Sequence, residues 1–229
     1  MDKDILINNE IISDDDNKID HRKLFRMFPF LKDKQKLKEL KIDIESLHYI
    51  SFRDHAQKIT QIIKQHLSKL NLDWYSIVIT DCTAGVGGNT LSFAHNFKFV
   101  NAIEIDETRC QYLKNNLKIY DLNNVQIFNV DCTSVLDKIR DQNVIFLDIP
   151  WGKFYKKYDI LRLNFGKQSI ENFCLDLMNP KIMKKIPSLV VLKLPKNYDI
   201  TYFYKIINAH NKEIYYYDLR KMIILVIKV

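Results

Sequence analysis

Short apolar runs alternate with helical patterns from residue 76 onward, and this alternation restricts the possible folds more than any other feature of the chain. Each run is a few residues long and is predicted to form a buried strand. The runs cover residues 76–81, 99–105, 125–131, 143–148 and 188–194. Helical patterns lie between them, as in "ETRCQYLKNNLKIY" at residues 107–120. Strands that alternate with helices predict an α/β fold with a doubly wound parallel sheet.

The segments before and after this region have different patterns. Near the C-terminus, "KEIYYYDL" and "MIILVIKV" are two strand-like runs separated only by Arg220 and Lys221, which predicts a hairpin with one antiparallel strand. Residues 21–70 contain apolar side chains at helical spacing, and residues 1–20 are polar and acidic. We therefore expect a mobile tail over 1–20, a small helical extension over 21–70 and a sheet domain over 71–229.

Composition places the chain among globular proteins of the cell interior. Its 229 residues, 47% of them hydrophobic, suit one domain of catalytic size. No run approaches the apolar length of a membrane span, and the acidic N-terminus is unlike a signal peptide. We expect a monomer in the cytoplasm or nucleus, without a membrane partner. The four cysteines lie far apart, so we expect reduced core thiols and no metal site.

The chain is basic, with a net charge of +7 and a sequence pI of about 9.0. Such a balance favours a polyanionic partner, most simply a nucleic acid. A solvated, lysine-rich surface explains the same charge equally well. Charge alone leaves both interpretations open.

Four of the predicted strands carry a carboxylate at the carboxyl end, where open α/β sheets bind their ligands. These acids are Asp81, Glu104, Asp131 and Asp148. The loop "CTAGVGGN" follows the first acid, and its glycines allow the backbone to approach a ligand closely. The candidate cofactor-binding residues are three of the acids and four members of this loop: Asp81, Glu104 and Asp131, with Thr83, Gly85, Gly87 and Asn89.

The loop does not match the common phosphate-binding motifs. It lacks the Gly-Lys-Ser/Thr of a P-loop, and Gly85 to Gly88 fit the dinucleotide-binding pattern poorly. The acid before the loop would repel a pyrophosphate, which favours a cationic, polyhydroxyl ligand. S-adenosylmethionine has these properties: its ammonium and sulfonium suit Asp81, its ribose hydroxyls suit Glu104, and its adenine amine suits Asp131. The alternatives are a tight strand-to-helix turn in an unrelated α/β protein and a dinucleotide site.

The end of the fourth predicted strand is the expected place for a methyl acceptor. It reads "LDIPWGKFY", and "DIPW" resembles the (Asp/Asn/Ser)-Pro-Pro-aromatic signature of methyltransferases that modify exocyclic amino groups. An amine conjugated with a ring is a weak nucleophile, so the site must accept its hydrogen bonds and orient it. Asp148 and the Ile149 carbonyl can accept these bonds. Pro150 stiffens the turn and Trp151 offers a face for stacking a base, although a core indole is the alternative for Trp151.

As a set, five motifs resemble the RNA cap guanine-N2 methyltransferases, the trimethylguanosine synthase group. They are "DCTAGVGGNTLSFA" (81–94), "AIEID" (102–106), "YLKNNLKIYDL" (112–122), "VIFLDIPWG" (144–152) and "KLPKNYDI" (193–200), in that family's order. The resemblance covers about residues 22–229. There are two departures. The family commonly has Ser-Pro-Pro-Trp-Gly-Gly where this chain has "DIPWGK", and "KFYKKYDILRLNFGKQ" is specific to this chain.

The resemblance implies a Rossmann-like fold, S-adenosylmethionine as methyl donor and a 7-methylguanosine RNA cap as substrate. The purine of this cap is cationic, which suits Trp151 because an indole face attracts cations. By resemblance, Phe25 would close over the cofactor and Lys196 would contact cap phosphate. Lys18, Arg22 and Lys153 are weaker phosphate candidates.

The sequence therefore predicts an S-adenosylmethionine-dependent enzyme that methylates guanine N2 of capped RNA to give 2,7-dimethylguanosine. Whether a second transfer gives 2,2,7-trimethylguanosine is left open. Asp148, Pro150 and Trp151 are the predicted catalytic residues, and the predicted substrate contacts are Trp151, Lys196 and Lys18. The transfer is expected to be direct, without a metal. The alternatives are an amino-group methyltransferase for a base in rRNA, tRNA or DNA, and an inactive RNA-binding module on the same fold.

Overall fold

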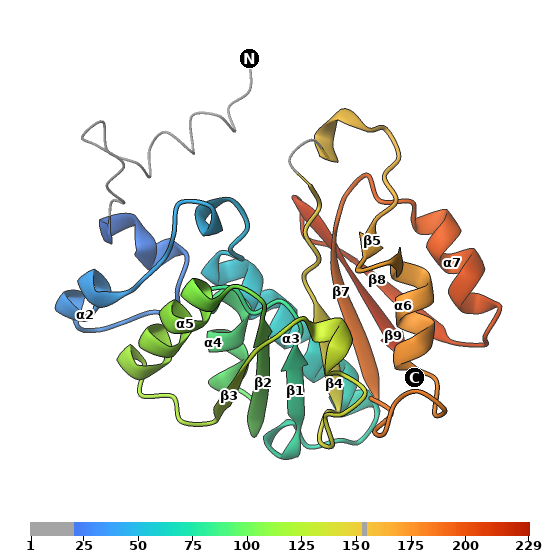
Figure 1. Cartoon of the computed structure of the whole chain (residues 1–229), viewed down its shortest axis with the longest axis horizontal. Helices are drawn as coiled ribbons and strands as arrows, with labels where there is room; N and C mark the ends of the chain where they lie inside the picture. Colours follow the sequence, from blue (N-terminus) through green and yellow to red (C-terminus); the bar gives the residue numbers. More distant parts are fainter. Residues whose placement is uncertain (1–20, 153–154) are drawn as a thin grey trace.

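The computed structural model describes residues 21–152 and 155–229, and a seven-stranded sheet forms its centre (Figure 1). The strand order is β3-β2-β1-β4-β7-β9-β8. The strands are β1 (Val78–Asp81), β2 (Phe99–Glu104), β3 (Val125–Asn129), β4 (Val144–Leu147), β7 (Leu189–Pro195), β8 (Glu213–Asp218) and β9 (Met222–Lys228). The first five in the spatial order are parallel, and β9 runs antiparallel between β7 and β8. The predicted doubly wound sheet and C-terminal hairpin are therefore confirmed.

Helices cover both faces of the sheet. One layer holds α3 (Arg53–Lys69), α4 (Gly88–Ala94) and α5 (Glu107–Ile119), and the other holds α6 (Ile170–Leu177) and α7 (Ile200–Asn208). In β4, Val144 and Phe146 pack against the first layer, whereas Ile145 and Leu147 pack against the second. All four side chains are buried, which explains why this strand is a continuous apolar run in the sequence.

Polar side chains fix the beginnings of several helices. Asp106 accepts a hydrogen bond from the backbone N–H of Arg109 at the start of α5, and Asp199 accepts one from Tyr202 at the start of α7. A short hairpin of β5 (Asn164–Phe165) and β6 (Gln168–Ser169) leads directly into α6. The capping residues Asp106 and Asp199 therefore mark the beginnings of α5 and α7, whereas α3 and α4 begin without a side-chain cap.

The N-terminal extension is less regular than its helical pattern predicts. It contains two 3₁₀ turns, η1 (His21–Arg26) and η2 (Ser46–His48), the short helix α2 (Lys34–Glu39), and then α3. The prediction of a helix is right for α3 and wrong for much of residues 27–52. The reason is that α2 is lysine-rich and buries no side chain, so nothing stabilises a longer helix there. Leu24, Met27 and Phe28 instead pack individually against α4 and α5.

The connection from β3 to β4 crosses the second face of the sheet with little helix. Between residues 130 and 143 the helical element is η4 (Cys132–Ser134). Leu136 and Ile139 from this connection are buried against the sheet. The four cysteines are free and buried, as predicted. Within 21–152 and 155–229, no helix combines the length and apolarity that crossing a bilayer requires.

Candidate cofactor and acceptor site

The glycine loop after β1 has a backbone that only glycine adopts easily. Gly85 and Gly87 have φ angles of 53° and 109°. A Cβ on Gly85 would meet no heavy atom within 4 Å, so open space lies beside this residue. A Cβ on Gly88 would lie 2.7 Å from Ile50 Cγ1 and 3.1 Å from the Ser51 carbonyl oxygen. The absence of side chains thus leaves room for a ligand on one side and for the 50–51 segment on the other.

Two of the predicted acids hold this loop in place. Asp81 is only 1% exposed and accepts hydrogen bonds from Thr90 Oγ1 at 2.7 Å and from the Thr83 N–H at 3.3 Å. Burial raises the pKa of Asp81 to about 7, although both hydrogen bonds lower it. Glu104 accepts from the Gly85 N–H at 2.8 Å and from the Asp106 N–H at 2.9 Å. Their direct contact with a cofactor stays a prediction, whereas their support of the loop is observed.

Asp131 differs from the other acids. It lies two residues beyond the end of β3 and is exposed. Its Oδ1 accepts hydrogen bonds from the backbone N–H and the hydroxyl of Thr133, at 2.9 and 2.8 Å. These bonds form a local turn, and within the described residues the second carboxylate oxygen accepts no hydrogen bond, so it is available to a ligand or to solvent. An adenine amine remains a suitable partner for it.

The glycine loop is joined to the "DIPW" stretch through two of the predicted cofactor residues. Thr83 Oγ1 accepts a hydrogen bond from the Asp148 N–H at 3.1 Å. Asn89 Nδ2 donates to Ser51 Oγ at 3.0 Å and lies 3.4 Å from Asp148 Oδ2. Asn89 Oδ1 is buried without a hydrogen-bond partner among the described residues. The predicted cofactor and acceptor regions therefore form one continuous site.

A buried ion pair lies at the centre of this site. Lys193 Nζ is 2.6 Å from Asp148 Oδ2, and the two side chains are 5% and 15% exposed. Ser51 Oγ approaches the same oxygen at 3.5 Å. Burial raises the pKa of Asp148, and the neighbouring Lys193 ammonium opposes this rise. All the contacts that described side chains make with this carboxylate go to Oδ2, so Oδ1 remains for an amine.

Lys193 and Ser51 were not among the residues predicted from the sequence. Lys193 had a detectable signal, because it is the one charged residue within the apolar run of β7. A lysine in a strand that is buried on both faces requires a partner. Ser51 had no comparable signal, since it lies in an irregular segment far from the acids.

The Trp151 side chain is half-buried and already lies close to a cation. Lys193 Nζ is 5.5 Å from the ring centroid, and the indole Nε1 lies 3.5 Å from the Lys193 carbonyl oxygen. Tyr155 contacts the ring edge-on, at 5.1 Å between centroids. Ile149 is buried and Pro150 is exposed, so in this turn the Ile149 side chain faces the core and Pro150 faces solvent. Lys193 thus binds both the acid and the aromatic residue of the signature.

The other predicted contacts are more dispersed. Phe25 lies on η1 and is 46% exposed. Lys196 is half-exposed and pairs with Asp218 at 2.5 Å. Lys18 and Lys153 lie outside the described residues, as does the side chain of Arg22. No cluster of His, Cys, Asp or Glu suited to a metal occurs in the described part of the chain, and metal-free transfer stays a prediction.

Comparison with known families identifies the kind of protein that carries this site. The model of the family described as RNA cap guanine-N2 methyltransferase matches residues 76–224. The chain belongs to this family. It is therefore an S-adenosylmethionine-dependent methyltransferase, and the matched region includes the glycine loop, the "DIPW" stretch and Lys193.

Other proteins are similar to this chain in sequence or in fold. Protein L320 of Acanthamoeba polyphaga mimivirus is 39% identical over 212 residues, which cover 84% of this chain and 80% of that protein. HI0767 of Haemophilus influenzae, described provisionally as a methylase, superposes with a TM-score of 0.51 at 16% identity, over 74% of this chain and 87% of that chain. PH1948 of Pyrococcus horikoshii, described provisionally as an RNA methyltransferase, superposes with a TM-score of 0.50 at 16% identity, over 91% of this chain and 97% of that chain. At these identities the two solved structures show the fold alone.

The site also fits the cofactor of the family. The space beside Gly85 lets a ligand approach the backbone, and Glu104 and Asp131 provide carboxylates at the adjoining strand ends. The buried Asn89 Oδ1 can accept a hydrogen bond from a donor such as an ammonium group. These groups together suit the charge and hydroxyl pattern of S-adenosylmethionine.

Proposed function

We propose that this protein transfers a methyl group from S-adenosylmethionine to guanine N2 of the 7-methylguanosine cap of RNA, with 2,7-dimethylguanosine as the product. The observation that carries the proposal is the family match over residues 76–224, within which an acid and an indole follow β4 directly beside the glycine loop. The cap is a polyanion with a cationic purine, which suits the basic chain. Capped RNA is therefore the proposed partner.

The proposed roles of the residues follow from their geometry. Asp148 Oδ1 and the Ile149 carbonyl would accept hydrogen bonds from the guanine amine and orient its nitrogen for attack. S-adenosylmethionine supplies the methyl group. Transfer would replace the donor's S–C bond with the new C–N bond, and Asp148 or water would take the amine proton. The raised pKa of Asp148 makes it a better proton acceptor than an exposed carboxylate.

A second candidate function is favoured by the position of Lys193. Its ammonium lies 5.5 Å from the centroid of Trp151, so a cationic purine near it would be repelled. A neutral base would not be. An amino group of an unmodified base within rRNA, tRNA or DNA is therefore the alternative acceptor. For a cap to bind, its cationic purine would have to reach the Trp151 ring from a side away from the Lys193 ammonium.

Turnover of m7GTP and GTP by the purified protein distinguishes these functions. We expect m7GTP to be methylated and GTP to be a poor substrate, because only the first has a cationic ring for Trp151. Trp151→Ala should lower kcat/KM for m7GTP by about 30-fold, the equivalent of about 2 kcal/mol, and Trp151→Phe much less. Equal turnover of both nucleotides would reject the cap and favour the internal base. Binding of S-adenosylmethionine without transfer to any RNA would instead indicate an inactive module.

A further inference from the structure

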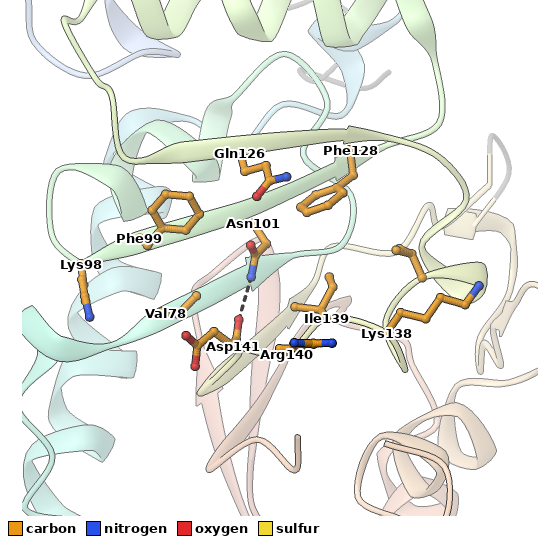
Figure 2. Close-up of a pocket in the computed structure, with 11 residues that line it drawn as sticks. Val78, Lys98, Phe99, Asn101, Gln126, Phe128, Lys138, Ile139, Arg140 and Asp141 are labelled. Atoms are coloured by element: carbon orange, nitrogen blue, oxygen red, sulfur yellow. Dashed lines mark hydrogen bonds between the residues drawn. The ribbon is translucent and has the colours of Figure 1, made fainter. Parts of the chain in front are cut away.

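A cavity of about 570 Å³ opens on the second face of the sheet, over β1, β2 and β3 (Figure 2). It lies between these strands and the 135–141 part of the β3–β4 connection. Its volume falls within the usual range of small-molecule sites, roughly 300–1,000 Å³. None of the predicted cofactor or acceptor residues lines it. The cavity is therefore separate from the site after β1 and β4.

Amide side chains, two of them buried, fix the wall of this cavity. Asn101 Nδ2 donates to the Asp141 carbonyl oxygen at 2.9 Å, the contact drawn in Figure 2. Gln142 is fully buried; it accepts a hydrogen bond from Thr80 Oγ1 of β1 at 3.3 Å and donates to the Leu136 carbonyl oxygen within the connection at 2.8 Å. Asn143 Oδ1 accepts a hydrogen bond from the Val78 N–H at 2.8 Å. The wall is thus tied to the sheet in three places, which makes the cavity preformed.

Aromatic rings and amides share the floor of the cavity. The rings of Phe99 and Phe128 are half-buried. Asn101 and Gln126 are register partners on β2 and β3, so their side chains are neighbours on this face. Within the described part of the chain, Asn101 Oδ1 and the Gln126 amide make no hydrogen bonds. They can therefore pair with the polar edge of a base, while a ring provides a stacking surface.

Exposed cations border the same cavity. Lys98 precedes β2, and Lys138 and Arg140 lie on the opposite wall. Lys138 Nζ also donates to the Ser134 carbonyl oxygen at 2.8 Å, which holds the side chain near the rim. Asp141 is the acid in the lining, so the cations outnumber it. This balance suits a phosphate rather than a cationic or neutral partner.

We propose that this cavity binds one nucleotide of the single-stranded RNA whose end is methylated. The base would stack against Phe128 or Phe99 and pair with the amides of Gln126 and Asn101. The phosphate would lie between Lys98 and the Lys138–Arg140 wall. The length of β2, from Phe99 to Glu104, separates the outer rim from the cofactor edge by roughly 17 Å. The bound nucleotide is therefore some distance along the RNA from the methylated base, and the inference rests on RNA being the substrate.

The test compares RNA binding with cap methylation in the same variants. The probe is a fluorescently labelled, capped, single-stranded 15-nucleotide RNA, measured by anisotropy without methyl donor. Lys138→Glu/Arg140→Glu should weaken its binding at least about tenfold, because two phosphate contacts become repulsive. Gln126→Ala should weaken it by roughly threefold to tenfold. Methylation of m7GTP, which is too short to reach the cavity, should stay within about twofold of the unmodified protein.

A matched charge change provides the control. Lys205 on α7 and Lys212 before β8 lie at the other edge of the sheet, and Lys205→Glu/Lys212→Glu changes the net charge equally. Unchanged affinity for S-adenosylmethionine checks that each variant is folded. RNA binding that is equal in both double variants, or unaffected by the cavity variants, would overturn the proposal. If m7GTP is not methylated but the cavity variants alone lose RNA binding, the cap function fails and the cavity proposal stands.

Discussion

Burial of the Asp148–Lys193 ion pair costs free energy, so the stability of the folded protein depends on the presence of both members. Both charges leave water on folding, and their attraction offsets this cost only while both are present. The strand positions fix them, since Asp148 follows β4 and Lys193 lies in the adjacent strand β7. Removal of the lysine would leave a buried carboxylate whose remaining side-chain donors, among the described residues, are Ser51 and Asn89.

Lys193→Met should therefore destabilise the protein by about 3–5 kcal/mol in urea unfolding. The double variant Asp148→Asn/Lys193→Met removes both charges, so its loss should be clearly smaller than the sum of the two single losses. Lys196→Met serves as the control. It breaks the exposed pair with Asp218 and should leave the unfolding free energy nearly unchanged. Additive single losses would show that the pair is not coupled.

The sequence allowed prediction of those site residues that lie at the ends of strands. Asp81, Glu104 and Asp148 each follow or end a strand, and parallel strands bring such ends together. What the sequence could not give is which donors each acid receives. Asp81 bonds to Thr90 and Asp148 to Lys193, and these pairs depend on the register between elements.

At the scale of elements, the start of α4 and the 50–51 segment form a close contact. Gly88 opens the helix, and Ile50 and Ser51 pack where its Cβ would be. Ser51 and Asn89 are hydrogen-bonded across the same contact. The N-terminal extension thus supports both the glycine loop and Asp148. This contact explains why an irregular segment, with little secondary structure of its own, has a defined position.

Gly88→Ala should disturb this contact and lower stability by about 1–3 kcal/mol, since the new methyl group would overlap Ile50 and the Ser51 backbone. Affinity for S-adenosylmethionine, measured by calorimetric titration, should fall with it. Ile50→Ala removes the nearest clashing atom, so in this background Gly88→Ala should cost less than it does alone. An alanine variant with unchanged stability and affinity would contradict the described packing.

The strands were predicted more accurately than the helical extension for a physical reason. The β4 and β9 runs are buried on both faces, so nearly every residue is apolar and the pattern is unambiguous. The extension covers one side of a finished core with scattered residues such as Leu24 and Phe28. Isolated anchors of this kind leave no period in the sequence, because each packs into its own pocket.

At the scale of the whole molecule, the buried Asp81 links protonation to stability. Its pKa is about 7 in the folded protein and 3.8 in the unfolded reference, so the folded state binds more protons between these values. The contribution of Asp81 to the free energy of unfolding is therefore constant below about pH 4 and decreases as the pH rises toward 7. The full loss is about 4 kcal/mol, which reflects the cost of a carboxylate without solvent.

The free energy of unfolding should consequently be lower at pH 7.5 than at pH 5.5, with about 2 kcal/mol of the difference due to Asp81. Asp81→Asn cannot ionise, so the variant should lack this part of the pH dependence. Urea unfolding of both proteins at the two pH values, without ligand, measures the difference directly. Other titrating groups are common to both proteins and cancel in the comparison. The same pH dependence in the variant would show that Asp81 is ionised throughout.

Cofactor binding should act on this same equilibrium. S-adenosylmethionine is cationic, and a cation near Asp81 favours the carboxylate and lowers its pKa. Saturating cofactor should therefore stabilise the unmodified protein more at pH 7.5 than at pH 5.5. At the lower pH, Asp81 must release a proton when the cofactor binds, and this release offsets part of the binding free energy. In Asp81→Asn the stabilisation should be weaker and nearly independent of pH. If cofactor stabilises the unmodified protein equally at both pH values, the cationic part of the ligand does not bind beside β1, and the predicted contact with Asp81 is wrong.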